Sequence, residues 1–148
     1  MGRFTRFTAK NQANDRPGSV QTLGPSVLDA VAFAAATERA LAHGDQRAIV
    51  LIELDADHAV KVAAETRILH AIRPDDRLGR LADGRLAVLT AMDGAARVAM
   101  RLGDRLREPF NVGAEHVRLS PQVGVGYAYA DVVTAEAILR EAENSPRY

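Results

Sequence analysis

The chain has 148 residues, of which 47% are hydrophobic and 26% are charged, a composition typical of one soluble globular domain. Its nineteen basic and nineteen acidic residues give a formal net charge of zero, and the basic ones are scattered, which argues against binding to nucleic acid or to an anionic membrane. The sequence has no cysteine, no apolar run near the roughly 20 residues that span a bilayer and no signal-peptide pattern at its N-terminus. We therefore expect a cytoplasmic protein, and the excess of arginine over lysine favours a bacterial source.

The start of the chain divides into an arm and the first element of a domain. Met1 to Leu23 is rich in polar residues and glycine and has no sustained helical or strand period, so we predict a flexible N-terminal arm followed by a single domain at residues 24–148. The domain opens with a predicted helix, because Ser26 can act as its N-cap, apolar residues then recur at helical spacing, and His43-Gly44 can end it.

The next two predicted elements are a strand and a helix. Arg47 to Leu54 contains a short aliphatic run rich in β-branched residues, a pattern typical of a central strand that is buried on both faces. Ala59 to Ile72 carries apolar residues along one side of a predicted helix. This helix has to end at Arg73-Pro74, because proline disfavours helical backbone in the residue before it.

A turn and a hairpin are predicted next. Arg73 to Asp76 has the pattern of a four-residue turn, which can bring the side chains of its first and last residues together. Two apolar-containing runs, at residues 77–82 and 85–90, flank Asp83-Gly84. This dipeptide favours a two-residue hairpin turn, in which both central residues need positive φ.

The remainder of the chain predicts a helix, one or two strands and a last helix. Gly94 to Arg107 has helical spacing, and Val117 to Tyr129 alternates as one or two strands with a break near Pro121. The last helix begins after Thr134, which is its expected N-cap. The order of elements indicates an α+β fold, an α/β sandwich around one central sheet.

Four segments occur in the order and spacing of motifs of the GGDEF domain of diguanylate cyclases, and the chain from Leu23 to its C-terminus resembles that family. The matching segments are Ile52-Glu53-Leu54-Asp55, Ile72-Arg73-Pro74-Asp75-Asp76, Arg80 to Leu89 and Leu119 to Gly126. The resemblance implies a nucleotide-cyclase-like fold, in which a central and mainly antiparallel sheet is flanked by helices.

The sequence departs from the family pattern at the positions where a cyclase performs its chemistry. Glu53 and Asp55 keep acids at the strand end, but the signature positions are occupied by Ala82-Asp83-Gly84-Arg85-Leu86, so Arg85 stands where the family places a metal-binding acid. Ala82 follows Glu53 by 29 positions, too few for the family's guanine-binding loop. Because phosphoryl transfer needs metal-bound and positioned nucleotide, we expect a degenerate domain that is not an enzyme and has no catalytic residues, metal or cofactor.

The segment Arg73-Pro74-Asp75-Asp76 agrees with the Arg-x-x-Asp site at which the family binds its product, cyclic di-GMP. Arginine can donate two parallel hydrogen bonds to O6 and N7 of guanine, and a carboxylate can accept from another edge of the base. The resemblance implies that Arg73 and Asp76 bind cyclic di-GMP together with an arginine of the following helix, either Arg101 or Arg97 one turn earlier.

Two functions are consistent with this sequence. The first is an inactive GGDEF-like domain that acts as a cyclic di-GMP receptor and relays the signal to an unidentified protein partner. The alternative is a module for protein interaction or homodimerisation that binds no nucleotide.

The sequence also predicts what replaces the lost metal. We expect the Arg85 guanidinium to form an ion pair with Glu53 or, failing that, Asp55; the alternative is that Arg85 points to solvent from an exposed strand. Asp55, Asp57 and His58 are not expected to bind a metal, because no second histidine or cysteine lies at a suitable spacing.

Overall fold

A computed structural model describes residues 26–128 and 134–148. In it a five-stranded sheet, in the order β1-β3-β4-β2-β7, is flanked by four helices, which confirms the α+β prediction. All neighbouring strands of this sheet are antiparallel except β1 and β3. The predicted arm, Met1 to Leu23, and the predicted strand end at Tyr129 lie outside the described residues.

Strand β2 (Arg47–Glu53) is the centre of the sheet. It pairs with β4 (Leu86–Ala91) on one side and with β7 (Gln122–Tyr127) on the other. The five residues from Ala48 to Ile52 are each at most 2% exposed. Apolar side chains on both faces of β2 are covered, and the prediction of a central strand buried on both faces is confirmed.

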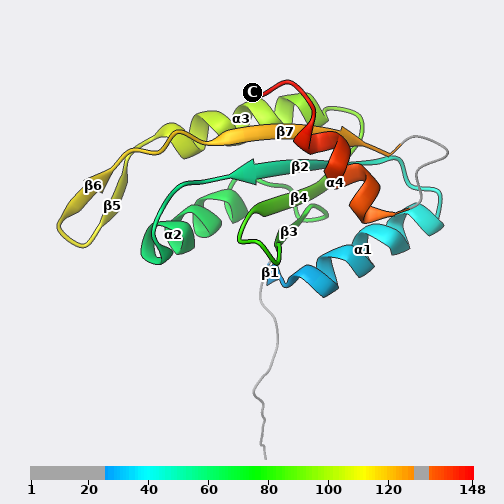
Figure 1. Ribbon diagram of the computed structural model, residues 1–148, viewed down its shortest axis with the longest axis horizontal. Coiled ribbons are helices and arrows are strands. Elements are labelled where there is room, and N and C mark those ends of the chain that lie inside the picture. The colour runs from blue at the N-terminus through cyan, green and yellow to red at the C-terminus, as the bar shows by residue number, and fades with distance from the viewer. Residues whose placement is uncertain (1–25, 129–133) are drawn as a thin grey trace, which may run out of the picture.

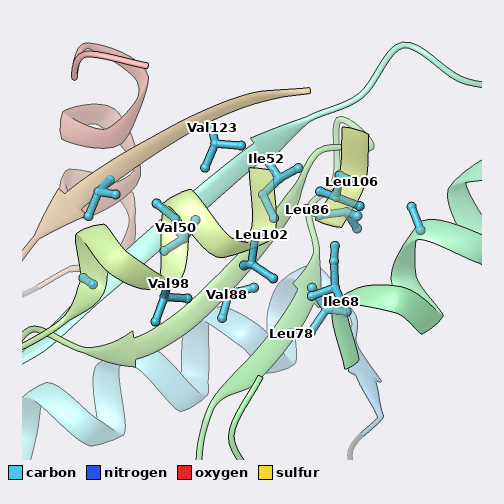
Figure 2. Close-up of a cluster of buried hydrophobic side chains, with 14 of the residues drawn as sticks. Val50, Ile52, Ile68, Leu78, Leu86, Val88, Val98, Leu102, Leu106 and Val123 are labelled. Atoms are coloured by element: carbon cyan, nitrogen blue, oxygen red, sulfur yellow. The ribbon is translucent and has the colours of Figure 1, made fainter. Parts of the chain in front are cut away.

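The helices form one layer on each face of the sheet (Figure 1). Helices α2 (His58–Leu69) and α3 (Ala95–Arg107) cover one face, where their apolar side chains pack on alternate residues of β2 and β4. Figure 2 shows this cluster, with Leu102 and Val98 of α3 facing Val50 and Val88 of the sheet. Helices α1 (Ala30–Ala42) and α4 (Ala135–Glu143) cover the other face through Phe33 and Ile138.

Helix α1 begins later than the sequence predicts. Asp29, not Ser26, is its N-cap, and the Asp29 carboxylate accepts a hydrogen bond of 2.8 Å from the backbone N–H of Ala32. The residues before it, Val27–Leu28, form strand β1, which pairs in parallel with Leu78 and Gly79. The predicted cap is wrong because this two-residue strand depends on a distant partner, which a local pattern does not reveal. The predicted end at His43-Gly44 is confirmed.

The predicted hairpin is confirmed between β3 (Arg77–Arg80) and β4, but its turn is one residue longer than expected. The backbone N–H of Gly84 donates to the carbonyl of Leu81 over 3.0 Å, and the N–H of Leu81 donates to the carbonyl of Arg85 over 2.8 Å. Three residues, 82–84, therefore form the loop. Gly84 has φ of +91°, as the last position of a three-residue hairpin loop requires.

A second, two-stranded hairpin was not predicted. Strands β5 (Phe110–Val112) and β6 (Glu115–Val117) form it, and Figure 1 shows it projecting from one end of the molecule. Arg67 of α2 fastens its base, because the guanidinium donates to the carbonyls of Arg105, Glu108 and Pro109 and lies 3.6 Å from the centre of the Phe110 ring. Strands of three residues with few apolar side chains give only a weak local pattern.

The last two elements agree with prediction. Strand β7 begins directly after Pro121, and the Thr134 hydroxyl caps α4 by accepting a hydrogen bond of 3.2 Å from Ala137. A Cβ atom at Gly126 would overlap the backbone of α4 at Ile138, so a glycine here allows the helix to lie directly on the strand. None of the described helices has the length and apolarity that a membrane span requires.

Candidate functional site

The turn that precedes β3 is built by its own aspartate. The backbone N–H of Asp76 donates to the carbonyl of Arg73 over 3.0 Å, and the Asp76 carboxylate in return accepts from the backbone N–H of Arg73, also over 3.0 Å. Asp76 is only 3% exposed. The predicted turn is confirmed, and these bonds fix the Asp76 side chain while its second oxygen, Oδ1, has no protein donor among the described residues.

A pocket of about 120 Å³ lies between this turn, the end of β4 and the first turns of α3. All four residues that the sequence singled out, Arg73, Asp76, Arg97 and Arg101, line it. Arg97 and Arg101 are one helical turn apart, so both project from the same side of α3. The structure therefore brings together the two segments of the predicted site, which are separated by two elements of the chain.

Three guanidinium groups border this pocket without an acidic partner. None of the ion pairs in the described part of the chain involves Arg73, Arg97 or Arg101, although carboxylates of Asp75, Asp76 and Asp93 line the same pocket. Arg101 is held in place by a hydrogen bond of 3.1 Å to the carbonyl of Ala71. Arg73 and Arg97 are exposed, and their guanidinium groups have no hydrogen-bond partner among the described residues.

The pocket combines donors and acceptors in a small space. The guanidinium groups can only donate hydrogen bonds and the carboxylates, when ionised, can only accept them. A ligand group that fits has to offer acceptors on one edge and N–H donors on another. Pockets for complete drug-sized ligands are typically about 300–1,000 Å³, so this pocket of about 120 Å³ suits one ring system, with the rest of a larger ligand outside.

The sequence did not single out several other residues that line the pocket. They are Asp75, Thr90, Ala91, Asp93, Gly94 and Val98. Thr90 is 3% exposed and follows Leu86 and Val88 on the same face of β4. From the sequence it is an ordinary β-branched strand residue, and only the position of α3 above it makes it part of a pocket.

A second pocket lies at the end of β2, where the family resemblance would place a metal. Glu53, Leu54, Asp55, Ser120 and Gln122 line this pocket of about 390 Å³. Nowhere in residues 26–128 and 134–148 do three histidine, cysteine, aspartate or glutamate side chains gather as metal ligands would. Glu53 and Asp55 are both exposed at this strand end.

The predicted ion pair between Arg85 and Glu53 or Asp55 is wrong. The Arg85 guanidinium donates instead to Asp83 in the hairpin loop and to Glu143 at the end of α4, each over 2.8 Å. Burial would lower the pKa of Arg85, but the hydrogen bond to Glu143 and the charge of Asp83 outweigh it and raise that pKa. The side chain lies on the face that α4 covers, and the helix supplies an acid closer than either predicted one.

Arg80, the arginine on the other strand of the same hairpin, pairs with a more buried acid. Its guanidinium binds both oxygens of Glu65 in α2 at 2.7 and 2.8 Å. The hydrogen bond and the charge of Glu65 raise the pKa of Arg80. The bidentate pair fastens α2 to the β3–β4 hairpin. The turn that borders the first pocket leads directly into this hairpin.

No protein-family model and no curated protein matches this sequence, but solved structures match its fold. The GGDEF domain of TpbB (YfiN) from Pseudomonas aeruginosa is 24% identical, with 80% of this chain and 81% of that chain covered and a TM-score of 0.68. A sensory box/GGDEF family protein from Caulobacter crescentus is 24% identical, with 82% and 91% covered and a TM-score of 0.66. The diguanylate cyclase SiaD of P. aeruginosa, solved in complex with its activator SiaC, is 21% identical, with 80% and 56% covered and a TM-score of 0.62.

At these identities the likeness establishes the fold and not the activity. The chain has the GGDEF fold, as its sequence motifs imply.

Proposed function

We propose that this chain is a catalytically inactive GGDEF-fold domain that binds cyclic di-GMP and relays the signal to a protein partner. The observation that carries the proposal is the pocket in which Arg73, Asp76, Arg97 and Arg101 meet, with three guanidinium groups that have no acidic partner in the described residues. An arginine without an ion-pair partner beside a pocket is available for an anionic or acceptor-rich ligand.

The donors and acceptors of the pocket match guanine. Arg73 is exposed at the rim and can donate two parallel hydrogen bonds to O6 and N7 of the base. The Oδ1 atom of Asp76, which has no protein donor in the described residues, can accept from the N–H groups of the same base. Arg97 and Arg101 then lie on the α3 side of the pocket, where they can bind a phosphodiester or the face of a base.

The proposed loss of catalysis rests on the second pocket and on the hairpin. A cyclase has to hold metal ions against the nucleotide phosphates. Here Glu53 and Asp55 stand without a third acid, and Arg85 is engaged with Asp83 and Glu143. The resembling family also has a guanine-binding loop between β2 and the hairpin, and in this chain that segment is too short to contain it.

The relay to a partner is supported by the fold. SiaD, which has the same fold, was solved in complex with an activator protein, so GGDEF-fold domains can belong to protein complexes. In this proposal, binding of cyclic di-GMP changes how the chain interacts with a partner protein or with a second copy of itself.

The proposal is tested by isothermal titration calorimetry of the purified chain with cyclic di-GMP and, in parallel, cyclic di-AMP. We expect micromolar or tighter binding of cyclic di-GMP. Cyclic di-AMP should bind at least about tenfold more weakly, because adenine places a donor where guanine has O6. No heat with cyclic di-GMP would favour the alternative of an interaction module that binds no nucleotide.

A further inference from the structure

Strand β7 lies at one end of the sheet, where it pairs with β2 and, within residues 26–128 and 134–148, with no strand on its outer side. An open strand edge presents backbone N–H and C=O groups with which another strand can pair, and proteins commonly protect such edges with charged side chains or proline. The sequence of β7, Gln-Val-Gly-Val-Gly-Tyr, contains neither. Another feature of the molecule therefore has to protect this edge.

Residues 145–148, which follow α4 and which we call the edge segment, provide this protection. The N–H of Val125 points away from β2 and donates to the Ser145 hydroxyl over 3.0 Å. The carbonyl of Val123 accepts a hydrogen bond of 2.9 Å from the N–H of Tyr148. The edge segment thus occupies hydrogen-bonding positions that a neighbouring strand would otherwise take.

The next outward N–H of β7 has a partner in α4. It belongs to Tyr127 and donates to the Glu141 carboxylate over 2.7 Å. Glu141 is exposed, so its side chain can turn towards solvent without leaving a buried charge. Of the bonds that cover the outer edge, those from Val125 and Tyr127 therefore end on side chains and not on another backbone.

The edge segment is attached mainly through bonds near the surface. Besides its bonds to β7, it is held by a bond of 2.9 Å from Arg107 to the Tyr148 carbonyl and by bonds of Ser145 and Arg147 to carbonyls at the end of α4. Residues 146–148 are exposed, and the segment contributes no side chain to either hydrophobic cluster of the described residues. Because water can replace the partners of such bonds, the segment can leave the edge while β7 stays in the core.

The uncovered edge would be self-complementary. In an antiparallel pair, opposite residues whose N–H and C=O groups face each other exchange two hydrogen bonds. On the outer edge of β7 these residues are Val123, Val125 and Tyr127, and they are spaced evenly about Val125. A second copy, related by a two-fold axis at Val125, would pair its Val125 with Val125 and its Tyr127 with Val123. The absence of charge on β7 removes any repulsion between the two strands.

We propose that the outer edge of β7 is an interface for a second copy of this chain, which the edge segment closes and which opens when the segment leaves. In the open form the two sheets join into one continuous sheet across the two-fold axis. In the closed form the edge segment prevents this pairing. The inference is independent of cyclic di-GMP binding and assigns a surface for self-association.

The test is the double variant Ser145→Ala, Tyr148→Pro in the full chain. It removes the acceptor of the Val125 N–H and the N–H that donates to Val123, while Pro146→Ala in the same segment keeps both bonds and is the control. Sedimentation equilibrium over a series of concentrations measures the dimer dissociation constant. In the double variant this constant should be at least about tenfold lower than in the wild type, and in the control it should equal the wild-type value.

Amide hydrogen exchange locates the interface. In the double variant the Val125 amide should exchange faster than in the wild type at low protein concentration, and it should be protected again at high concentration, where the second copy accepts its hydrogen bond. Circular dichroism checks the fold. If the double variant does not fold, Ser145→Ala alone, which keeps the Tyr148 bond, should lower the dissociation constant at least about threefold.

Three results would overturn the inference. They are a folded variant that remains monomeric at every concentration, a dissociation constant equal to that of the wild type, and a dimer in which the Val125 amide stays unprotected. The first two would show that the edge segment does not control self-association. The third would show that the two copies meet at another surface.

Discussion

Two arginines of the same hairpin meet acids of very different exposure. The Glu65 side chain that binds Arg80 is 9% exposed, whereas the Glu143 side chain that binds Arg85 is 42% exposed. A carboxylate in contact with water loses little when its partner is removed, but a buried carboxylate loses both its partner and its hydration. The two pairs should therefore differ in their contribution to stability.

We predict that Arg80→Ala lowers the free energy of unfolding by about 2–3 kcal/mol, because it leaves the buried Glu65 without its bidentate partner. Arg85→Ala should cost only about 0–1 kcal/mol, as expected for an exposed pair. Urea denaturation of the two variants measures both values. Equal losses, or a larger loss for Arg85→Ala, would contradict this difference.

Single residues of the site differ in how far the sequence revealed them. Arg73 and Asp76 belong to one short turn, so their proximity follows from local geometry and was predicted. Arg97 and Arg101 came from the family resemblance, and the structure brings them to the same pocket. Thr90 and the Glu143 partner of Arg85 were not found, because both depend on how α3 and α4 pack over the sheet.

At the scale of elements, helix α1 offers a direct test of where its first turn begins. Asp29→Ala removes the N-cap bond to Ala32 and should lower the free energy of unfolding by about 1 kcal/mol. Ser26→Ala is the matched control, because Ser26 is exposed and lies before β1, and it should change stability by less than about 0.5 kcal/mol. Thermal or urea unfolding measures both. A larger effect at Ser26 would show that the helix starts there, as the sequence alone predicts.

The elements that the sequence predicted have strong local signals. The aliphatic run of β2, the glycine of the hairpin loop and the threonine cap of α4 each specify their element within a few residues of chain. Strands β1 and β5–β6 have only two or three residues each. Strand β1 forms because the distant strand β3 supplies its hydrogen bonds, and the β5–β6 hairpin is held at its base by Arg67. A local sequence pattern does not reveal such distant partners.

The molecule has one pocket at the Arg73–Asp76 turn and another at the end of β2, and we predict that they differ in function. We propose the first as the cyclic di-GMP site and the second as the remnant of a catalytic site. We predict that the chain forms no cyclic di-GMP from GTP with Mg²⁺ or Mn²⁺, because Arg85 stands where the resembling family places a metal-binding acid and the segment between Glu53 and Ala82 is too short for that family's guanine-binding loop. Chromatography of the nucleotides after incubation measures this, with an active diguanylate cyclase as positive control. Cyclic di-GMP above the level found in a reaction without protein would contradict the prediction.

The most direct test of the receptor function is a titration of three proteins with cyclic di-GMP: the wild type, Arg73→Ala and Arg118→Ala. Arg118 is an exposed arginine outside the pocket, so its variant controls for the loss of one positive charge. Removing a bidentate contact to guanine costs about 1–3 kcal/mol, so Arg73→Ala should bind about 5- to 150-fold more weakly than the wild type. Arg118→Ala should bind as the wild type does, and circular dichroism should show that both variants keep the fold. Unchanged affinity in a folded Arg73→Ala variant would contradict the assignment of this pocket as the cyclic di-GMP site.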